Sequence, residues 1–295
     1  GAIAGTLISA LNPAHLGPVA ESESGTASTE SESTLPQHAS AALNLAGPGG
    51  GRSLNSVLQL KQPMTELGAE IQLLIDAYPD LTPGVFVYDL DNGNYLDING
   101  SSSFSAASMI KVPVLVAFFQ DVETGKISLD EMLAMMESDV AEGSGEMQFS
   151  PINTQYSALE TATKMIIISD NTATNMLIRR MGGKDALNQR FQSWGLPLTT
   201  IRNPLADLEG TNTTSPKELV ALMTMVSEGT LFNDMRSRDR VLDIMRRTYT
   251  DTLLPQGIGL EAAIAHKTGD IGSMVGDVGL VDVPNGKRYA ITVMV

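Results

Sequence analysis

The sequence predicts an α+β fold in which an antiparallel sheet covered by helices adjoins an all-helical lobe, with a cleft between the two. Strand-like segments occur early in the chain, at 84–98, and again late, at 263–295. Nearly every segment between about 105 and 248 has a helical pattern instead. Because strands bracket a helical middle, the simplest architecture joins the early and late strands in one sheet.

The first 62 residues are predicted to lie outside the folded domain. From Gly17 to about Asn55 the chain is rich in Ser, Glu, Ala, Gly and Pro and has no aromatic residue, which is typical of a disordered linker. The apolar opening, Gly1 to Leu11, fits the cut end of a secretion signal or membrane anchor and equally a weakly ordered terminus. No run reaches the roughly 18 apolar residues of a transmembrane helix.

The folded domain is predicted to cover 63–295 and to begin with a helix from about Met64 to Ala77, where apolar residues recur at helical spacing. A hairpin should follow, with strands at 84–90 and 95–98. Between them, Asn92-Gly93 suits the positive-φ positions of a type I′ turn.

The helical lobe is expected over about 105–249, between the two parts of the sheet lobe at 63–104 and 250–295. Three capping boxes predict helix starts: Ser128 with Glu131, Ser157 with Glu160, and Ser215 with Glu218. Three strands should close the chain, over 263–269, 275–283 and 288–295. Met132, Met135, Met136, Met223, Met225, Phe191 and Trp194 are expected to fill the core.

Composition excludes several functions. The 295 residues carry a formal net charge of −15, which repels nucleic acid. Without cysteine there is no thiol nucleophile, thiolate site or disulfide, and the three histidines lack metal-ligand spacing. We therefore expect no metal and no cofactor.

Three short motifs carry the candidate chemistry. In Ser108-Met-Ile-Lys111, at the start of an apolar helix, hydroxyl and amine would share one face. Burial and a second nearby cation would lower the pKa of the lysine, so that the neutral amine could take the serine proton. The other two motifs are Ser169-Asp-Asn171, which also suits a capped helix break, and Lys267-Thr-Gly269, which also suits an ordinary strand end.

The order S-x-x-K, S-D-N, K-T-G resembles that of class A β-lactamases and penicillin-binding proteins, over about Pro63 to Val295. The resemblance implies a β-lactamase/transpeptidase-like fold with the active site between its lobes. It also implies that Ser108 is the acylated nucleophile, that Lys111 activates it, and that Ser169 relays a proton to the leaving nitrogen.

The resemblance assigns substrate binding as well. Asn171 would hold the substrate's amide carbonyl, while Lys267 and Thr268 would meet its carboxylate beside Gly269. The backbone N–H groups of Ser108 and Asp270 would form an oxyanion hole. The acidic side chain of Asp270 would disfavour an anionic ligand there unless it points away. Arg288 is a candidate second carboxylate anchor, and Glu142-Gly-Ser-Gly-Glu146 suits either a loop at the cleft rim or a plain surface turn.

The hydrolytic lactamases of this family carry a glutamate before a T-T-x-P segment, here Thr213-Thr-Ser-Pro216, and family spacing places Leu205 at that position. Leucine cannot activate water, so the resemblance is closest to the cyanobacterial penicillin-binding protein A group, whose members are D-alanyl-D-alanine peptidases. Asp207 or Glu209 could still supply the base, in which case the chain would be a β-lactamase. A third alternative is a non-catalytic module that binds peptidoglycan.

The expected partners are peptidoglycan stem peptides and β-lactam antibiotics. A wall substrate implies an extracytoplasmic location, the periplasm or cell wall. A membrane tether through the N-terminal segment is one alternative that the sequence leaves open. A monomer is expected. Carboxypeptidase, endopeptidase and transpeptidase reactions share the acyl-enzyme, so the sequence leaves them open.

Overall fold

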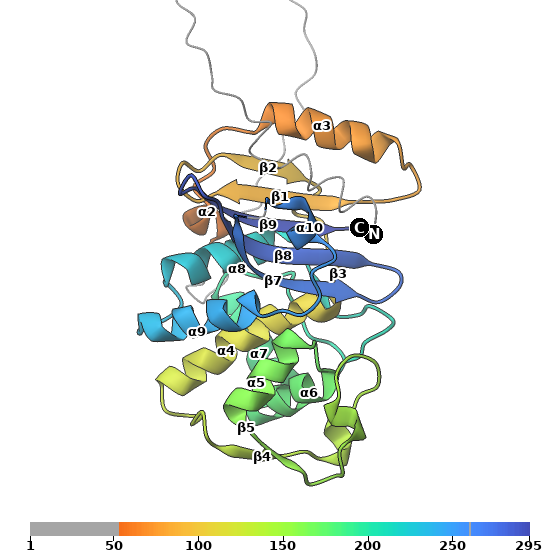
Figure 1. Cartoon of the computed structure of the whole chain (residues 1–295), viewed down its shortest axis with the longest axis vertical. Coiled ribbons are helices and arrows are strands. Elements are labelled where there is room, and N and C mark those ends of the chain that lie inside the picture. Colours follow the sequence, from red (N-terminus) through yellow and green to blue (C-terminus); the bar gives the residue numbers. More distant parts are fainter. Residues whose placement is uncertain (1–52, 260) are drawn as a thin grey trace, which may run out of the picture.

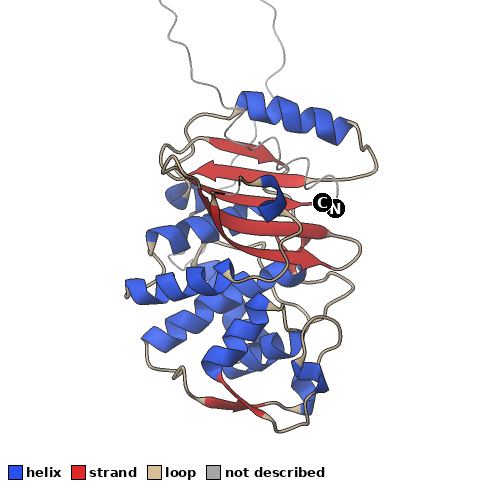
Figure 2. Ribbon diagram, viewed as in Figure 1, coloured by secondary structure: helices blue, strands red, loops and turns tan. Residues whose placement is uncertain are grey.

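A computed structural model describes residues 53–259 and 261–295 and confirms the α+β fold. Its main sheet is antiparallel with the strand order β2-β1-β9-β8-β7, so the early hairpin and the late strands are joined as expected (Figures 1 and 2). The strands are β1 (Gly84–Asp89), β2 (Tyr95–Ile98), β7 (Ala263–Asp270), β8 (Val275–Asp282) and β9 (Arg288–Met294).

Helices cover both faces of this sheet. On the outer face lie α3 (Thr65–Asp76) and the short α10 (Leu254–Gly257), and their apolar side chains form a small core with those of the strands (Figure 1). On the inner face α8 (Pro216–Glu228) packs against β1, β8 and β9. The sheet is therefore wedged between α3 and the helical lobe.

The helical lobe is built around α4 (Lys111–Glu123), whose residues are almost all buried. A helix that is apolar on every side needs partners all round it. Here they are α5 (Ala158–Ile167), α6 (Asn171–Arg180), α7 (Gly183–Ser193) and α9 (Met235–Arg246). Below them, β4 (Met132–Ala134) pairs with β5 (Gln155–Ser157), and β3 (Phe104–Ser105) pairs with β6 (Thr213–Thr214) elsewhere in the lobe.

The folded domain begins earlier than the expected boundary at 63. The short helix α2 (Leu54–Val57) precedes Leu58, which is only 2% exposed. The segment is also tied to the hairpin, because Lys61 N–H donates to Gly93 and Tyr95 N–H donates to Gln62. The rest of the predicted linker, with the apolar opening, lies outside the described residues. Among the described residues, no helix has the length and apolar character to span a bilayer.

Local details depart from expectation where tertiary contacts outweigh sequence pattern. In the hairpin turn only Gly93 has a positive φ, of 81°, so the turn is not type I′; the Asp89 carboxylate instead accepts from Asp91 N–H and Asn92 N–H. No helix begins at Ser128, because Glu131 pairs with Arg180 and the chain continues into β4. Met132 and Met136 are about half exposed rather than in the core.

The other two predicted caps are present. Ser157 Oγ accepts from Glu160 N–H at the start of α5, and Ser215 Oγ accepts from Glu218 N–H at the start of α8. Met135, Met223, Met225, Phe191 and Trp194 are buried as expected.

Candidate active site

The nucleophile candidate Ser108 lies in a 3₁₀ turn, η2 (Ala107–Ile110), that leads directly into α4. This turn is pressed against β7: a Cβ atom on Gly269 would lie 3.2 Å from the backbone nitrogens of both Ser108 and Met109. Glycine at 269 is thus needed because the strand passes close to the nucleophile's own backbone.

The amine of Lys111 lies in the centre of the site. It is fully buried and its Nζ is 2.9 Å from Ser108 Oγ, 3.0 Å from Ser169 Oγ and 2.8 Å from Asn171 Oδ1. Burial, and secondarily the positive charge of Lys267, hold the pKa of Lys111 well below its usual value, although Asp170 opposes them. The structure therefore brings the S-x-x-K and S-D-N residues together around one amine, whose neutral form is favoured more than in an ordinary lysine.

Ser169 completes this network. Its Oγ donates to Ser108 Oγ at 2.9 Å from a backbone with a φ of 57°, which is rare for residues other than glycine. The next residue, Asp170, holds this conformation, since its carboxylate accepts from the backbone N–H groups of Ala173, Glu146 and Met147. The motif is thus both a helix cap and a strained turn that aims Ser169 at the nucleophile.

The 142–146 segment forms one wall of the site. Asn171 donates from Nδ2 to Glu142 O at 2.9 Å, and from its backbone N–H to Ser144 O at 3.0 Å. Gly145 has a φ of 100°, and a Cβ there would lie 2.3 Å from the Asp170 carboxylate. Of the two alternatives for this segment, the structure selects the loop against the S-D-N motif.

Lys267 is buried on β7 and donates to Thr268 O at 2.7 Å. Burial lowers the pKa of Lys267 to about 8, against a partial rise caused by Asp277. Asp277 is itself paired with the buried His266, 3.0 Å away. At neutral pH Lys267 therefore remains mostly protonated and can attract an anion.

Asp270 ends β7, where its exposed carboxylate accepts from Gly272 N–H at 2.8 Å. The side chain is thus engaged in the β7–β8 turn. Arg288 lies at the other end of the sheet: it opens β9 and donates to Ser227 Oγ at 3.2 Å, whereas Lys267 lies opposite Val278, which pairs with Thr292. Four residues along a strand span about 13 Å, so Arg288 is not a second anchor in this site.

Leu205 lies in the loop 202–212, next to Ala206, whose Cβ would be 4.0 Å from a Cβ on Gly143 in the 142–146 wall. Leu205 is buried, and both its N–H and its C=O are bonded to the side chain of Asn175, at 3.0 and 2.9 Å. Asp207 turns inward, because its carboxylate accepts from the Thr211 and Asn212 backbone N–H groups, while Glu209 is exposed. Asp207 is therefore occupied within its own loop.

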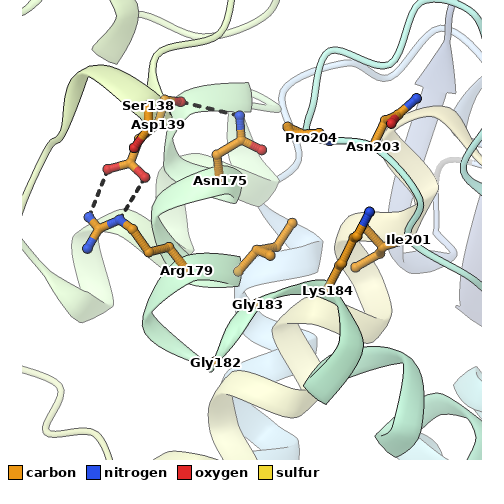
Figure 3. A pocket seen from close by; sticks show the side chains of 11 residues that line it. Ser138, Asp139, Asn175, Arg179, Gly182, Gly183, Lys184, Ile201, Asn203 and Pro204 are labelled. Atoms are coloured by element: carbon orange, nitrogen blue, oxygen red, sulfur yellow. Dashed lines mark hydrogen bonds and ion pairs between the residues drawn. The ribbon is translucent and has the colours of Figure 1, made fainter.

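Asn175 is a site-supporting residue that the motifs did not indicate. It follows Asn171 by one helical turn, a spacing that puts both amides on one face of α6 and could have indicated it. Behind it lies a cavity of about 360 Å³, between the Arg179–Asp139 ion pair and Ile201, Asn203 and Pro204 (Figure 3). Because this side of the 202–212 loop faces a cavity, the position of the loop depends on the two hydrogen bonds from the Asn175 side chain to Leu205, here called the Asn175 clamp.

Within the described residues, no cluster of three or more His, Asp or Glu side chains could hold a metal ion. The arrangement around Ser108 is suited to proton transfer and acyl transfer, with an amine next to a hydroxyl and a buried cation nearby.

Comparisons with known proteins agree with this geometry. Residues 66–295 match the model of the beta-lactamase enzyme family. A solved structure of PBP-A is 53% identical, with a TM-score of 0.78 over 80% of this chain and 89% of that chain. A Leu-to-Glu variant of PBP-A, solved as an acyl-enzyme complex with penicillin G, is 52% identical, with the same TM-score and coverage. Among curated relatives, beta-lactamase VEB-1 of Pseudomonas aeruginosa is 24% identical over 72% of this chain and 76% of its own length.

Proposed function

The chain belongs to the beta-lactamase enzyme family, as a serine hydrolase of that fold, and on this premise we propose that it is a penicillin-binding D-alanyl-D-alanine peptidase. It would act on peptidoglycan stem peptides through an acyl-enzyme at Ser108. β-Lactams would acylate the same serine, and the resulting ester would be hydrolysed slowly.

The amine–hydroxyl pair supports the acylation step. Neutral Lys111 takes the Ser108 proton as Oγ attacks the carbonyl carbon, and the developing oxyanion is held by backbone N–H groups of Ser108 and Asp270. Ser169, bonded to both groups, passes a proton to the leaving nitrogen as the C–N bond breaks. Water, or an acceptor amine, then attacks the ester carbonyl and restores the Ser108 hydroxyl.

The charges of the site support a substrate that ends in a carboxylate. Protonated Lys267 and the hydroxyl of Thr268 would bind the terminal carboxylate, since charge-assisted hydrogen bonds are the stronger kind. The Asn171 amide would align the penultimate peptide group. A peptide ending in D-alanyl-D-alanine and a penicillin both present a carboxylate close to a reactive amide.

The observation that carries the peptidase assignment is the loop at Leu205. Its backbone is clamped by Asn175 and its side chain is an apolar part of the core, so no base occupies this position. Asp207 is bonded within the loop and offers no replacement. General-base catalysis contributes about 10² to 10⁴ in rate, so a penicillin ester should persist on Ser108.

The proposal also sets location and assembly. A peptidoglycan substrate requires an extracytoplasmic enzyme, in the periplasm or cell wall, and the residues before 53 would serve as a tether to the membrane. The site is assembled from one chain, so a monomer suffices.

Intact-protein mass spectrometry after brief exposure to benzylpenicillin tests the proposal, with Ser108→Ala as control. We expect an adduct that lasts for hours and requires Ser108, together with release of D-alanine from a peptide ending in D-alanyl-D-alanine. Rapid penicillin turnover without a lasting adduct would make the chain a β-lactamase. If neither an adduct nor turnover is observed, the chain is a non-catalytic binding module.

A further inference from the structure

A buried acid and a buried histidine are paired behind the strand that carries Lys267. His266 Nδ1 lies 3.1 and 3.0 Å from the two carboxylate oxygens of Asp277, and both side chains are buried. Asp277 Oδ2 also accepts from the backbone N–H of Leu254 in α10, at 3.1 Å. Because α10 covers the outer face of the sheet, this bond places the pair on that face.

The pair adjoins the end of β7 that is expected to bind substrate. Asp277 lies directly opposite Thr268 in the β7–β8 register, and neighbouring strands are about 4.8 Å apart. Successive side chains leave a strand on opposite faces, so Lys267 is directed away from His266 to the inner face, where its charge acts on Lys111. A single sheet layer therefore separates the Asp277 carboxylate from the amine expected to bind the substrate's carboxylate.

The charge of Asp277 favours protonated Lys267. Burial lowers the pKa of Lys267 to about 8, and the Asp277 carboxylate partly offsets this fall. On the inner side, α4 begins with Lys111, a buried base of the same kind. Without the Asp277 carboxylate, burial would act on Lys267 unopposed, and a smaller fraction of it would be charged at neutral pH.

Other charged groups on the adjoining elements are engaged elsewhere. α9 packs against β7, and its Arg246 lies 3.5 Å from Asp282, the last residue of β8. Asp270, at the end of β7, accepts from a backbone N–H of the β7–β8 turn. On β9 the residue opposite Asp277 is the apolar Val293. Asp277 is thus the carboxylate placed to act on Lys267.

We propose that Asp277 is a positioning residue: its carboxylate, oriented by His266 and by the Leu254 N–H, keeps Lys267 charged for the carboxylate of the substrate. The inference rests on the proposed function, in which Lys267 binds that carboxylate. It extends the recognition site through the sheet to a pair of side chains on the opposite face from the substrate.

The first test follows the charge of Lys267 directly. The full-length protein is labelled with ¹³C-lysine, the Lys267 Cε signal is assigned by its absence in Lys267→Met, and its NMR shift is followed from pH 5 to 10. The midpoint, about 8 in the parent, should fall by about one pH unit in Asp277→Asn, the lower end of the effect of a neighbouring opposite charge. An unchanged midpoint would overturn the proposal.

Two matched variants separate charge from packing. Asp282→Asn removes the same charge from the end of β8, where it pairs with Arg246, and should keep the parent's midpoint. His266→Gln keeps the Asp277 carboxylate and offers it a side-chain N–H, so the midpoint should not fall. An equal fall in His266→Gln would mean that strand packing, and not the carboxylate, controls Lys267, and would refute the proposal.

The second test asks whether this charge is used in recognition. Benzylpenicillin and its methyl ester, which lacks the carboxylate, are compared at pH 8 as acylating agents of Ser108. A shift of one pH unit lowers the charged fraction of Lys267 from about one half to about one tenth, so the ratio of the acid's rate to the ester's should fall about fivefold in Asp277→Asn. A purely structural defect would slow both reactions alike, and an unchanged ratio would refute the proposal.

Two further arrangements keep the proposal decidable. If Asp277→Asn does not fold, His266→Leu/Asp277→Leu removes the whole pair, a replacement that buried ion pairs often tolerate, and must show the lowered midpoint. If penicillin does not acylate the parent, the proposed function fails, and binding of a peptide ending in D-alanyl-D-alanine, or of its C-terminal amide, is read from the Lys267 signal. Weaker binding of the acid alone in Asp277→Asn supports the role of Asp277, and unchanged binding refutes it.

Discussion

Lys111 Nζ has four oxygen atoms within 3.0 Å: Ser108 Oγ, Ser169 O, Ser169 Oγ and Asn171 Oδ1. A neutral amine has two N–H groups, which can bond to two of these oxygens, while its lone pair can accept from a hydroxyl. Only the serines offer such a hydroxyl. The neutral form that burial favours is therefore also the form that can receive the Ser108 proton.

Replacing Lys111 by methionine should slow penicillin acylation by about 10² to 10⁴, because the general base is lost while the apolar stem is kept. The adduct is followed by quenched-flow mass spectrometry, and circular dichroism checks the fold. Ser108→Ala defines zero adduct. Acylation within about tenfold of the parent would assign the base to another group.

The pH dependence should have two limbs that belong to the two lysines. Acylation should rise as Lys111 loses its proton at its lowered pKa, and fall above about pH 8 as Lys267 loses the charge that binds the carboxylate. One pH unit above that value, about one Lys267 in ten stays charged. Stopped-flow acylation rates from pH 5 to 10 measure both limbs.

A penicillin methyl ester is the matched control for the alkaline limb, since it has no carboxylate for Lys267 to bind. Its acylation should lack the fall near pH 8. If the ester and the free acid fall together, Lys267 acts on the reacting groups and not on the carboxylate.

At the scale of elements, two asparagines hold the segment that brings Leu205 to the site. Asn175 bonds to both backbone groups of Leu205, and Asn188 on α7 bonds in the same way to both backbone groups of Ile201, each at 2.8 Å. The two clamps have the same chemistry, but of the two only the Asn175 clamp lies one helical turn from Asn171 of the active site.

Asn175→Ala should destabilise the fold by about 1–3 kcal/mol for each Leu205 group left buried without a partner. It should also change the lifetime of the penicillin adduct, because the loop shifts toward or away from the acyl group. Asn188→Ala should lower stability, by urea unfolding, without changing that lifetime. Equal effects of both variants on the adduct would show that the loop does not act through Leu205.

Sequence patterns predicted elements well where the decisive contacts are local. Ser157 and Ser215 cap helices because each hydroxyl needs only a backbone N–H three residues later. Ser128 has the same pattern and fails, since Glu131 is drawn to Arg180, which also donates to Lys126 O. The Glu131–Arg180 pair joins residues 49 positions apart, so the local sequence pattern around Ser128 cannot predict it.

At the scale of the whole molecule, the fold followed from strands that bracket a helical middle, and the site followed from three motifs in order. The motifs lie at a helix start, a helix break and a strand, so only the folded chain brings them together. What the pattern could not supply are the supports: the Asn175 clamp, the strained Ser169 turn and the fixed loop at Glu142. Each depends on contacts between segments distant in sequence.

The domain boundary offers a test at this scale. Every site residue named above and the part of the core that the structure describes lie within 53–295, and residues 17–52 have the composition of a linker. A chain starting at Ser53 should therefore keep the parent's melting temperature within about 2 °C, less than the shift caused by 1 kcal/mol in a domain of this size, and its acylation rate.

A chain starting at Pro63 removes only ten more residues but also the buried Leu58 and the Lys61 and Gln62 bonds to the hairpin. Losing a buried leucine costs about 2–5 kcal/mol, so this chain should melt at least about 4 °C lower. Acylation by penicillin at 20 °C should persist, since neither the serines nor the lysines of the site contact this segment. Equal melting temperatures of the two truncated chains would place the boundary at 63. Loss of penicillin acylation in the chain that starts at Ser53 would extend the catalytic unit into the first 52 residues.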